Sequence, residues 1–353
     1  MSIEVIDKRS GRYGLDINAT KREIKALSKV ENLSVIQFVE PVKDINTWKN
    51  IERHLLLKRP NVGIRVYGHY SEECDLGFLQ YIPSTTRFFA DCISDCKNIE
   101  SLSLLKNLEE LSIGIFHISN FDFLNNISNK LSFLFLGETK SISINISHIK
   151  RFKNLEVFYN DGMKKVLDNL QHLTNLKKLT LRGVKLANLD FLSELKNLER
   201  LSLLFGSYKS LDSISNLKSL KEIEFSRVRQ IPGYEFLNSL ENLEQIEFEG
   251  MSKMTSIPDL SRLRKLKKIV VDNNSRLQNI SSIGNIQNVK AFRLIFSQSS
   301  KVKEIDGLLN QAYDLMLKSN SIRFTNILDS FDSNTQQKLI QKGIKPLKWD
   351  TVI

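Results

Sequence analysis

Three cysteines and five histidines are the side chains in this sequence that could hold a metal ion or act as nucleophiles. Cys92 and Cys96 form a C-x-x-x-C pair, and Cys74 precedes them. A structural zinc site needs four ligands, but neither a second cysteine pair nor two adjacent histidines complete the set. The histidines are scattered, at His54, His69, His117, His148 and His172. We therefore expect buried, reduced thiols, with no metal ion and no other cofactor.

The short motifs of common enzyme classes are also missing. The sequence has no phosphate-binding G-x-x-x-x-G-K-[ST], no G-x-S-x-G nucleophile turn and no H-E-x-x-H zinc motif. We therefore expect that the protein is not an enzyme.

The formal net charge of +11 permits attraction to nucleic acid, to anionic lipid or to an acidic protein. Much of the excess is Lys in a chain that is also rich in Asn, Ile and Ser, which indicates compositional bias as much as a binding site. Neither a signal peptide at residues 1–18 nor an apolar stretch of membrane-spanning length is present. We expect a cytoplasmic protein without a membrane span, and we expect a monomer.

An apolar pattern, L-x-x-L-x-L with Leu, Ile, Val or Phe in the apolar slots, recurs along the chain. From Leu108 onward, successive copies start 21 to 24 residues apart. The clear copies are Leu108/Leu111/Ile113, Leu131/Leu134/Leu136, Leu176/Leu179/Leu181, Leu198/Leu201/Leu203, Leu220/Ile223/Phe225, Leu243/Ile246/Phe248, Leu266/Ile269/Val271 and Val289/Phe292/Leu294, with a weaker one at Leu155/Phe158. Upstream, Leu33/Ile36/Phe38 matches fully, whereas Ile64/Val66 and Phe88/Ala90 keep only the final alternation. We count about twelve units, the first three irregular.

Each unit combines two local patterns. The alternation at the end of the triplet predicts a short strand, and a second apolar cluster predicts a helical turn behind it. The clearest clusters lie at 121–124, 189–192, 211–214, 234–237 and 280–283. One unit cannot bury its apolar face alone, so neighbouring units must stack and align their strands in a parallel sheet.

This pattern resembles the leucine-rich-repeat family, and most closely the short bacterial type of about 22 residues found in internalins. The units Leu176-Lys-Lys-Leu179-Thr-Leu181 and Asn197-Leu198-Glu-Arg-Leu201-Ser-Leu203 carry the resemblance, which covers roughly residues 20–297. It implies an α/β fold: a right-handed, horseshoe-shaped solenoid with a parallel concave sheet and short helical or irregular convex segments. We divide the chain into an N-terminal cap with an irregular first repeat (1–60), leucine-rich repeats (61–297) and a C-terminal helical cap (298–353).

One position departs from the family, which places Asn just beyond the strand, where its amide bonds neighbouring backbone. Here only Asn274 fits; the other units carry Phe116, Thr139, Met163, Val184, Gly206, Val228, Met251 and Ser297. We expect an apolar-packed turn and a less regular solenoid.

Helical covers are expected at both ends. Thr20 and Glu23 resemble a capping box that opens a helix, and a second helical stretch runs through Trp48. In the tail, residues 308–317 and 336–341 predict helices, the latter stopped by Gly343 and Pro346.

The resemblance also implies which side chains face the concave side, because side chains alternate along a strand. The N-terminal units then present mainly aromatic candidates: Tyr67, Arg87, Phe89, Phe133, Phe135 and Tyr159. The middle units present basic and then acidic candidates: Lys178, Arg182, Arg200, Glu222, Glu224, Glu247 and Glu249. Clustered exposed aromatics usually mark an interface.

We therefore expect a scaffold that binds another protein with a basic or mixed-charge surface, as an inhibitor, immunity protein or effector. The alternative is binding of nucleic acid or an anionic surface through basic residues. A basic run at 262–268 could contact phosphates, but no aromatic stacking residue lies nearby, which favours a solvated convex face.

Overall fold

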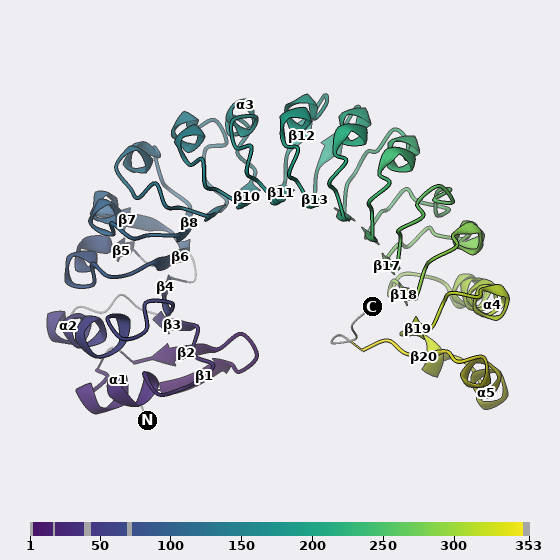
Figure 1. Ribbon diagram of the computed structural model, residues 1–353, viewed down its shortest axis with the longest axis horizontal. Helices are drawn as coiled ribbons and strands as arrows, with labels where there is room; N and C mark the ends of the chain where they lie inside the picture. Colours follow the sequence, from purple (N-terminus) through teal and green to yellow (C-terminus); the bar gives the residue numbers. More distant parts are fainter. Residues whose placement is uncertain (1–2, 17, 39–43, 69–72, 349–353) are drawn as a thin grey trace. The chain divides into compact units, whose positions relative to one another are not determined.

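The computed structural model describes residues 3–16, 18–38, 44–68 and 73–348. The chain folds as two compact units, Met1–Leu176 and Lys177–Ile353. In each unit, strands line one side and helical turns the other (Figure 1). The end of the expected C-terminal cap, 349–353, lies outside the described residues.

Unit 1 contains a sheet whose neighbouring strands follow chain order. Its first two strands, β1 and β2, form an antiparallel hairpin, and all later pairings are parallel. The strands are β1 (Ile3–Asp7), β2 (Arg12–Leu15), β3 (Val35–Phe38), β4 (Gly63–Tyr67), β6 (Arg87–Ile93), β8 (Glu110–Ile115), β9 (Phe133–Leu136) and β10 (Val157–Asp161). The helices and turns are α1 (Lys21–Leu27), α2 (Ile45–Ile51) with its π-helical extension η1 (Glu52–Leu56), η2 (Leu76–Tyr81), η3 (Ile99–Leu104), η4 (Asp122–Asn125), η5 (Ser147–Arg151) and α3 (Leu167–Leu170). A small second sheet pairs β5 (Glu73–Asp75) with β7 (Asp95–Lys97).

Unit 2 repeats the arrangement with parallel strands throughout its main sheet. The strands are β11 (Lys178–Arg182), β13 (Arg200–Leu204), β15 (Glu222–Ser226), β16 (Gln245–Glu249), β17 (Lys268–Asp272), β18 (Ala291–Ile295), β19 (Phe324–Thr325) and β20 (Lys345–Pro346). The turns and helices are η6 (Asp190–Glu194), η7 (Asp212–Asn216), η8 (Glu235–Ser239), η9 (Ser281–Asn285), α4 (Val302–Lys318), η10 (Leu328–Ser330) and α5 (Ser333–Gln341). β12 (Lys185–Leu186) and β14 (Ser207–Tyr208) form a small separate sheet.

The expected strand-and-turn repeat is confirmed. In β11 the alternating Leu179 and Leu181 are buried, while Lys178, Thr180 and Arg182 keep solvent contact. The five apolar clusters of the sequence coincide with the 3-10 turns η4, η6, η7, η8 and η9. The leucine-rich-repeat solenoid is therefore the fold of both units.

The ends of the chain agree in part with the expectation. Thr20 and Glu23 form the capping box of α1, and the ring of Trp48 stacks on Phe78 with centroids 4.1 Å apart. In the tail, α4 and α5 are present as expected, but the short strands β19 and β20 also continue the sheet. The tail is thus not helical alone, because its two helices alternate with strands as the crossovers of the repeats do.

The turns beyond the strands are packed as the sequence suggested. Met163, Val184, Val228 and Met251 are buried there. The amide of Asn274 accepts from the Met251 backbone N–H at 2.7 Å and donates to the Phe248 carbonyl at 2.8 Å.

An asparagine ladder does exist, but at the opposite end of the strands. The Nδ2 groups of Asn175, Asn242 and Asn288 donate to backbone carbonyls of the preceding repeats at 2.7, 2.7 and 2.6 Å. Each of these residues stands directly before the first apolar residue of its triplet. The recurrent Asn-Leu pair was therefore a readable signal for backbone support where the chain enters each strand.

Candidate partner-binding surface

The open face of each sheet is the face opposite the helical turns (Figure 1). The candidate residues belong to the strands of these sheets. In unit 1 the strand register aligns Phe89 with Ser112, Ser112 with Phe135, and Phe135 with Tyr159. A second row aligns Arg87 with Glu110 and Glu110 with Phe133. The predicted side chains therefore do share one face, but Glu110 and Ser112 of β8 separate the aromatics into two groups.

The first group consists of Tyr67 and Phe89, and each of these rings contacts an arginine side chain. The Arg65 guanidinium lies 4.8 Å from the centroid of the Tyr67 ring. Its Nε donates to Asp91 Oδ2 at 2.7 Å, and its Nη1 donates to Gln37 Oε1 at 2.8 Å. Arg65 was absent from the predicted set, yet it organises this part of the open face.

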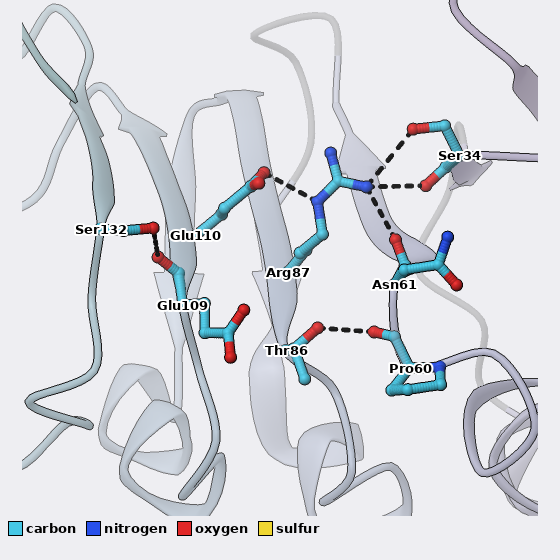
Figure 2. A network of polar contacts seen from close by, with 8 residues as sticks. All are labelled: Ser34, Pro60, Asn61, Thr86, Arg87, Glu109, Glu110 and Ser132. Carbon is cyan, nitrogen blue, oxygen red and sulfur yellow. Dashed lines mark hydrogen bonds and ion pairs between the residues drawn. The ribbon is translucent and has the colours of Figure 1, made fainter. Parts of the chain in front are cut away.

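Arg87, a predicted binding residue, is held by its own chain (Figure 2). Its Nε donates to Glu110 Oε2 at 2.8 Å, and its Nη1 donates to the Asn61 carbonyl at 2.8 Å and to the Ser34 carbonyl at 3.2 Å. The guanidinium also lies 5.7 Å from the ring of Phe89. Arg87 thus links the beginnings of strands in successive repeats.

The second group consists of Phe133, Phe135 and Tyr159, which we call the aromatic cluster. The rings of Phe135 and Tyr159 stack with centroids 4.5 Å apart. All three side chains are half-buried, so each keeps a part of its ring accessible. Next to them, Gly137 allows close approach of the strands, since a Cβ there would lie 2.9 Å from Gly114 Cα.

In unit 2 the basic and acidic candidates meet across neighbouring strands. Arg200 pairs with Glu222 at 3.1 Å and with Glu224 at 3.5 Å. Ser202 donates a hydrogen bond of 2.7 Å to the same Glu224. These carboxylates are partly neutralised within the sheet, while Lys178 at the start of β11 is exposed.

The remaining acidic residues form an acidic cluster: Glu247, Glu249 and Asp272, with Glu224 beside Glu247 in the register. Glu249 accepts from Ser226 at 2.6 Å and lies 3.7 Å from Arg227. Among the described residues, Glu247 has neither a hydrogen bond nor an ion pair. Burial, followed by repulsion from the neighbouring carboxylates, raises the pKa of Glu247; burial and repulsion from Glu249 likewise raise the pKa of Asp272.

Phe205 is a candidate that the sequence did not single out. It directly follows β13, is 41% exposed, and has a φ of +53°, which is a strained value for a residue with a side chain. The guanidinium groups of Arg182 and Arg227 lie 5.0 and 5.3 Å from its ring centroid. In other repeats the same left-handed position holds Gly183, Arg227, Gly250 and Asn273. Only the aromatic type of its side chain therefore distinguishes Phe205.

The thiol of Cys92 lies beside Tyr67, and the side-chain hydrogen bond between them raises the pKa of Tyr67. Cys74, Cys92 and Cys96 are free, and Cys74 and Cys96 are register partners in the β5–β7 pair. Burial raises the pKa of Cys74 to about 12 and also raises that of Cys96. Across the described residues, no group of three or more His, Cys, Asp or Glu side chains is arranged to hold a metal ion; His69 lies outside that part of the chain.

Comparisons with known proteins agree with the fold. No family model matches the chain, and no curated protein matches it in sequence. An internalin of Listeria monocytogenes matches in structure with a TM-score of 0.57 and 17% identity, over 90% of this chain and 88% of the other. A leucine-rich-repeat protein of Leptospira interrogans gives a TM-score of 0.56 and 19% identity, over 86% and 74%.

The chain is therefore a leucine-rich-repeat protein by fold. The structural match to an internalin agrees with the resemblance stated from the sequence. At 17 to 19% identity, this similarity concerns the fold. No helix within the described residues is both long and apolar enough to cross a membrane.

Proposed function

We propose that the protein is a non-catalytic scaffold that binds another protein through the open face of its sheets. The observation that carries this proposal is the aromatic cluster, in which three half-buried rings stand on the face opposite the helical turns. Aromatic side chains dominate the energy of protein interfaces because they bury large apolar areas at little entropic cost. The aromatic cluster is the anchor of the interface.

The acidic cluster defines the chemistry of the partner. The carboxylate of Glu247 is partly desolvated, and attraction to Arg293 offsets only part of the repulsion from the neighbouring carboxylates. A basic side chain from a partner would relieve this repulsion, whereas an acidic one would increase it. The partner therefore carries a basic or mixed-charge surface, and the protein acts on it as an inhibitor, immunity protein or effector.

The setting of this function is the cytoplasm, where the protein works as a monomer. Three free cysteines favour a reducing compartment.

The test is affinity capture from the source cells with immobilised protein, followed by titration with the identified partner. The variant Phe133→Ala/Phe135→Ala/Tyr159→Ala should lose at least roughly 100-fold in affinity, because hot-spot aromatics contribute about 2 kcal/mol or more each. The matched control is Leu57→Ala/Leu104→Ala/Ile142→Ala, which removes three exposed apolar side chains of the same unit outside its strands. Equal affinity of the aromatic variant and the wild type, with both folded, would refute the proposal.

Binding of nucleic acid is the second candidate, and Phe205 is the observation that favours it. The Phe205 ring is 41% exposed and suited to stack on a base, and the two guanidinium groups beside it attract phosphates. This candidate predicts that a single-stranded RNA oligonucleotide binds and that its affinity falls steeply with salt. If Phe205→Ala has no effect on such binding, this surface is not the site.

A further inference from the structure

A hollow of about 680 Å³ lies beside the loops that lead into β16, β17 and β18 in unit 2. Its lining includes Asn238 and Asn242 from one repeat and Ser261, Arg262, Arg264 and Lys265 from the next. None of these residues belongs to a strand. The hollow is therefore separate from the open-face residues considered above.

The crossover that borders the hollow differs from its neighbours. The segments before β16 and before β18 contain the 3-10 turns η8 and η9, whereas residues 250–267, all described, contain no helical turn. Instead, Ser256 forms a parallel bridge with Asn279, and the Ile257 N–H donates to the Asn279 carbonyl at 3.0 Å. The crossover at 250–267 is therefore extended where it pairs with Asn279, whereas the crossovers before β16 and β18 each contain a 3-10 turn.

The backbone and amides around the hollow are fixed by hydrogen bonds. Asn242 donates to the Lys218 carbonyl at 2.7 Å and accepts from Lys265 Nζ at 2.6 Å. Asn288 donates to the Arg264 carbonyl at 2.6 Å. The ladder of asparagines thus holds the two loops in place and keeps the Lys265 ammonium at the wall.

The guanidinium groups of Arg262 and Arg264, which line the hollow, are accessible to a ligand. Arg262 and Arg264 are exposed and make no side-chain hydrogen bond or ion pair within the described residues, unlike Arg65, Arg87 and Arg200. With Lys265, they place three cations on a lining whose single carboxylate is Glu241. The hollow is therefore strongly biased towards anions.

The other lining groups are hydrogen-bonding side chains. Ser261 and Gln287 can donate and accept. Asn238, which also lines the hollow, has an amide oxygen that is buried without a hydrogen-bond partner. A ligand with hydroxyl or amine groups next to its anion would suit this set.

We propose that this hollow binds a phosphorylated small molecule of about nucleotide size. Arg262 and Arg264 hold the phosphate, because the planar guanidinium presents paired donors that match phosphate oxygens. Lys265 adds a fixed positive charge, and the amide and hydroxyl side chains bind the remainder of the molecule. The volume falls within the range of about 300 to 1,000 Å³ that is usual for small-ligand sites.

The test is calorimetric titration of the full chain at about 0.15 M salt with three probes: ATP, inorganic pyrophosphate and adenosine. ATP and pyrophosphate should bind with a Kd below about 1 mM, and adenosine, which lacks phosphate, should not. The variant Arg262→Ala/Arg264→Ala should weaken ATP binding at least about 10-fold, since hydrogen bonds from charged donors are the strong ones. Both arginines are exposed, so the variant should keep the wild-type unfolding midpoint.

The matched control is Arg229→Ala/Arg276→Ala, which removes two exposed arginines of the same unit that do not line the hollow. This control should bind ATP as the wild type does. Absence of binding, equal weakening in both double variants, or binding of long RNA without binding of ATP would overturn the proposal. The aromatic-cluster variant should bind ATP normally, so this result is independent of the proposed open-face function.

Discussion

The ring of Phe135 on β9 stacks on the ring of Tyr159 on β10, with centroids 4.5 Å apart and planes inclined by 28°. We expect the two rings to be energetically coupled by about 0.5 to 1.5 kcal/mol in a double-mutant cycle of urea unfolding with Phe135→Ala and Tyr159→Ala. A second cycle with Phe133→Ala and Tyr159→Ala should be closer to additive, because the register aligns Phe133 with Val157 and not with Tyr159. Strict additivity of the Phe135 and Tyr159 effects would show that the stack does not stabilise the sheet.

Arg87 should behave as a structural residue. Replacing it by Met removes donors from the Ser34 and Asn61 carbonyls and from Glu110, which should lower the free energy of unfolding by about 1 to 2 kcal/mol. The control Arg229→Met removes an exposed arginine without such bonds and should change stability by less than about 0.5 kcal/mol. Urea unfolding measures both. If the two variants are equally stable, the hydrogen bonds of Arg87 drawn in Figure 2 contribute nothing to stability.

Glu247 should make stability depend on pH. Because burial and neighbouring carboxylates raise its pKa in the folded protein, the folded state binds a proton more readily than the unfolded state. Stability is then lost as the pH rises from the ordinary carboxyl range through the raised folded pKa. Glu247→Gln should therefore be more stable than the wild type at pH 7, by less than about 1 kcal/mol, and the difference should vanish towards pH 4.

The control for this prediction is Glu244→Gln. A hydrogen bond from Lys267 lowers the pKa of Glu244, so its charged form stabilises the fold above the ordinary carboxyl range and this contribution is lost on acidification. Glu244→Gln should thus be less stable than the wild type at neutral pH. Thermal unfolding from pH 4 to 8 measures both variants, and the same sign of change for both would contradict the assignment.

The backbone conformation at Phe205 should lower the free energy of unfolding for any residue that carries a Cβ. Its left-handed φ disfavours any side chain by roughly 1 to 2 kcal/mol. Both Phe205→Gly and Phe205→Ala remove the ring from between Arg182 and Arg227, but only glycine relieves the strain. Phe205→Gly should therefore be more stable than Phe205→Ala by about 1 kcal/mol in urea unfolding. A glycine variant that is no more stable than the alanine variant would show that the turn carries no strain.

The repeat fold was readable because its signals are local. In Leu176/Leu179/Leu181 the spacing of apolar residues fixes which side of a strand is buried, and the capping box of Thr20 and Glu23 involves only residues of one turn. The stacking order followed as well, since each unit needs its neighbours. The hairpin β1–β2 and the strands β19 and β20 were not predicted, because they are short and lie outside the period.

The binding surface was readable only in outline. Alternation along the strands placed Phe135 and Tyr159 on the open face, and the register then brought their rings into contact. The alternation also places Ser112, between Leu111 and Ile113, in the same row as Phe135, but it gave no sign that Arg87 is held by Ser34 and Asn61. These relationships join different repeats.

The sequence by itself determined the repeat, the buried faces and the side chains that the open face presents, because each depends on spacing within one unit. Only the tertiary structure decided which charges are paired and which stay available. Arg87, at the start of a strand, meets carbonyls of earlier repeats, whereas Arg262, on a crossover, lines a hollow. The difference depends on what lies one or two repeats away in space, which the stacking of the units alone defines.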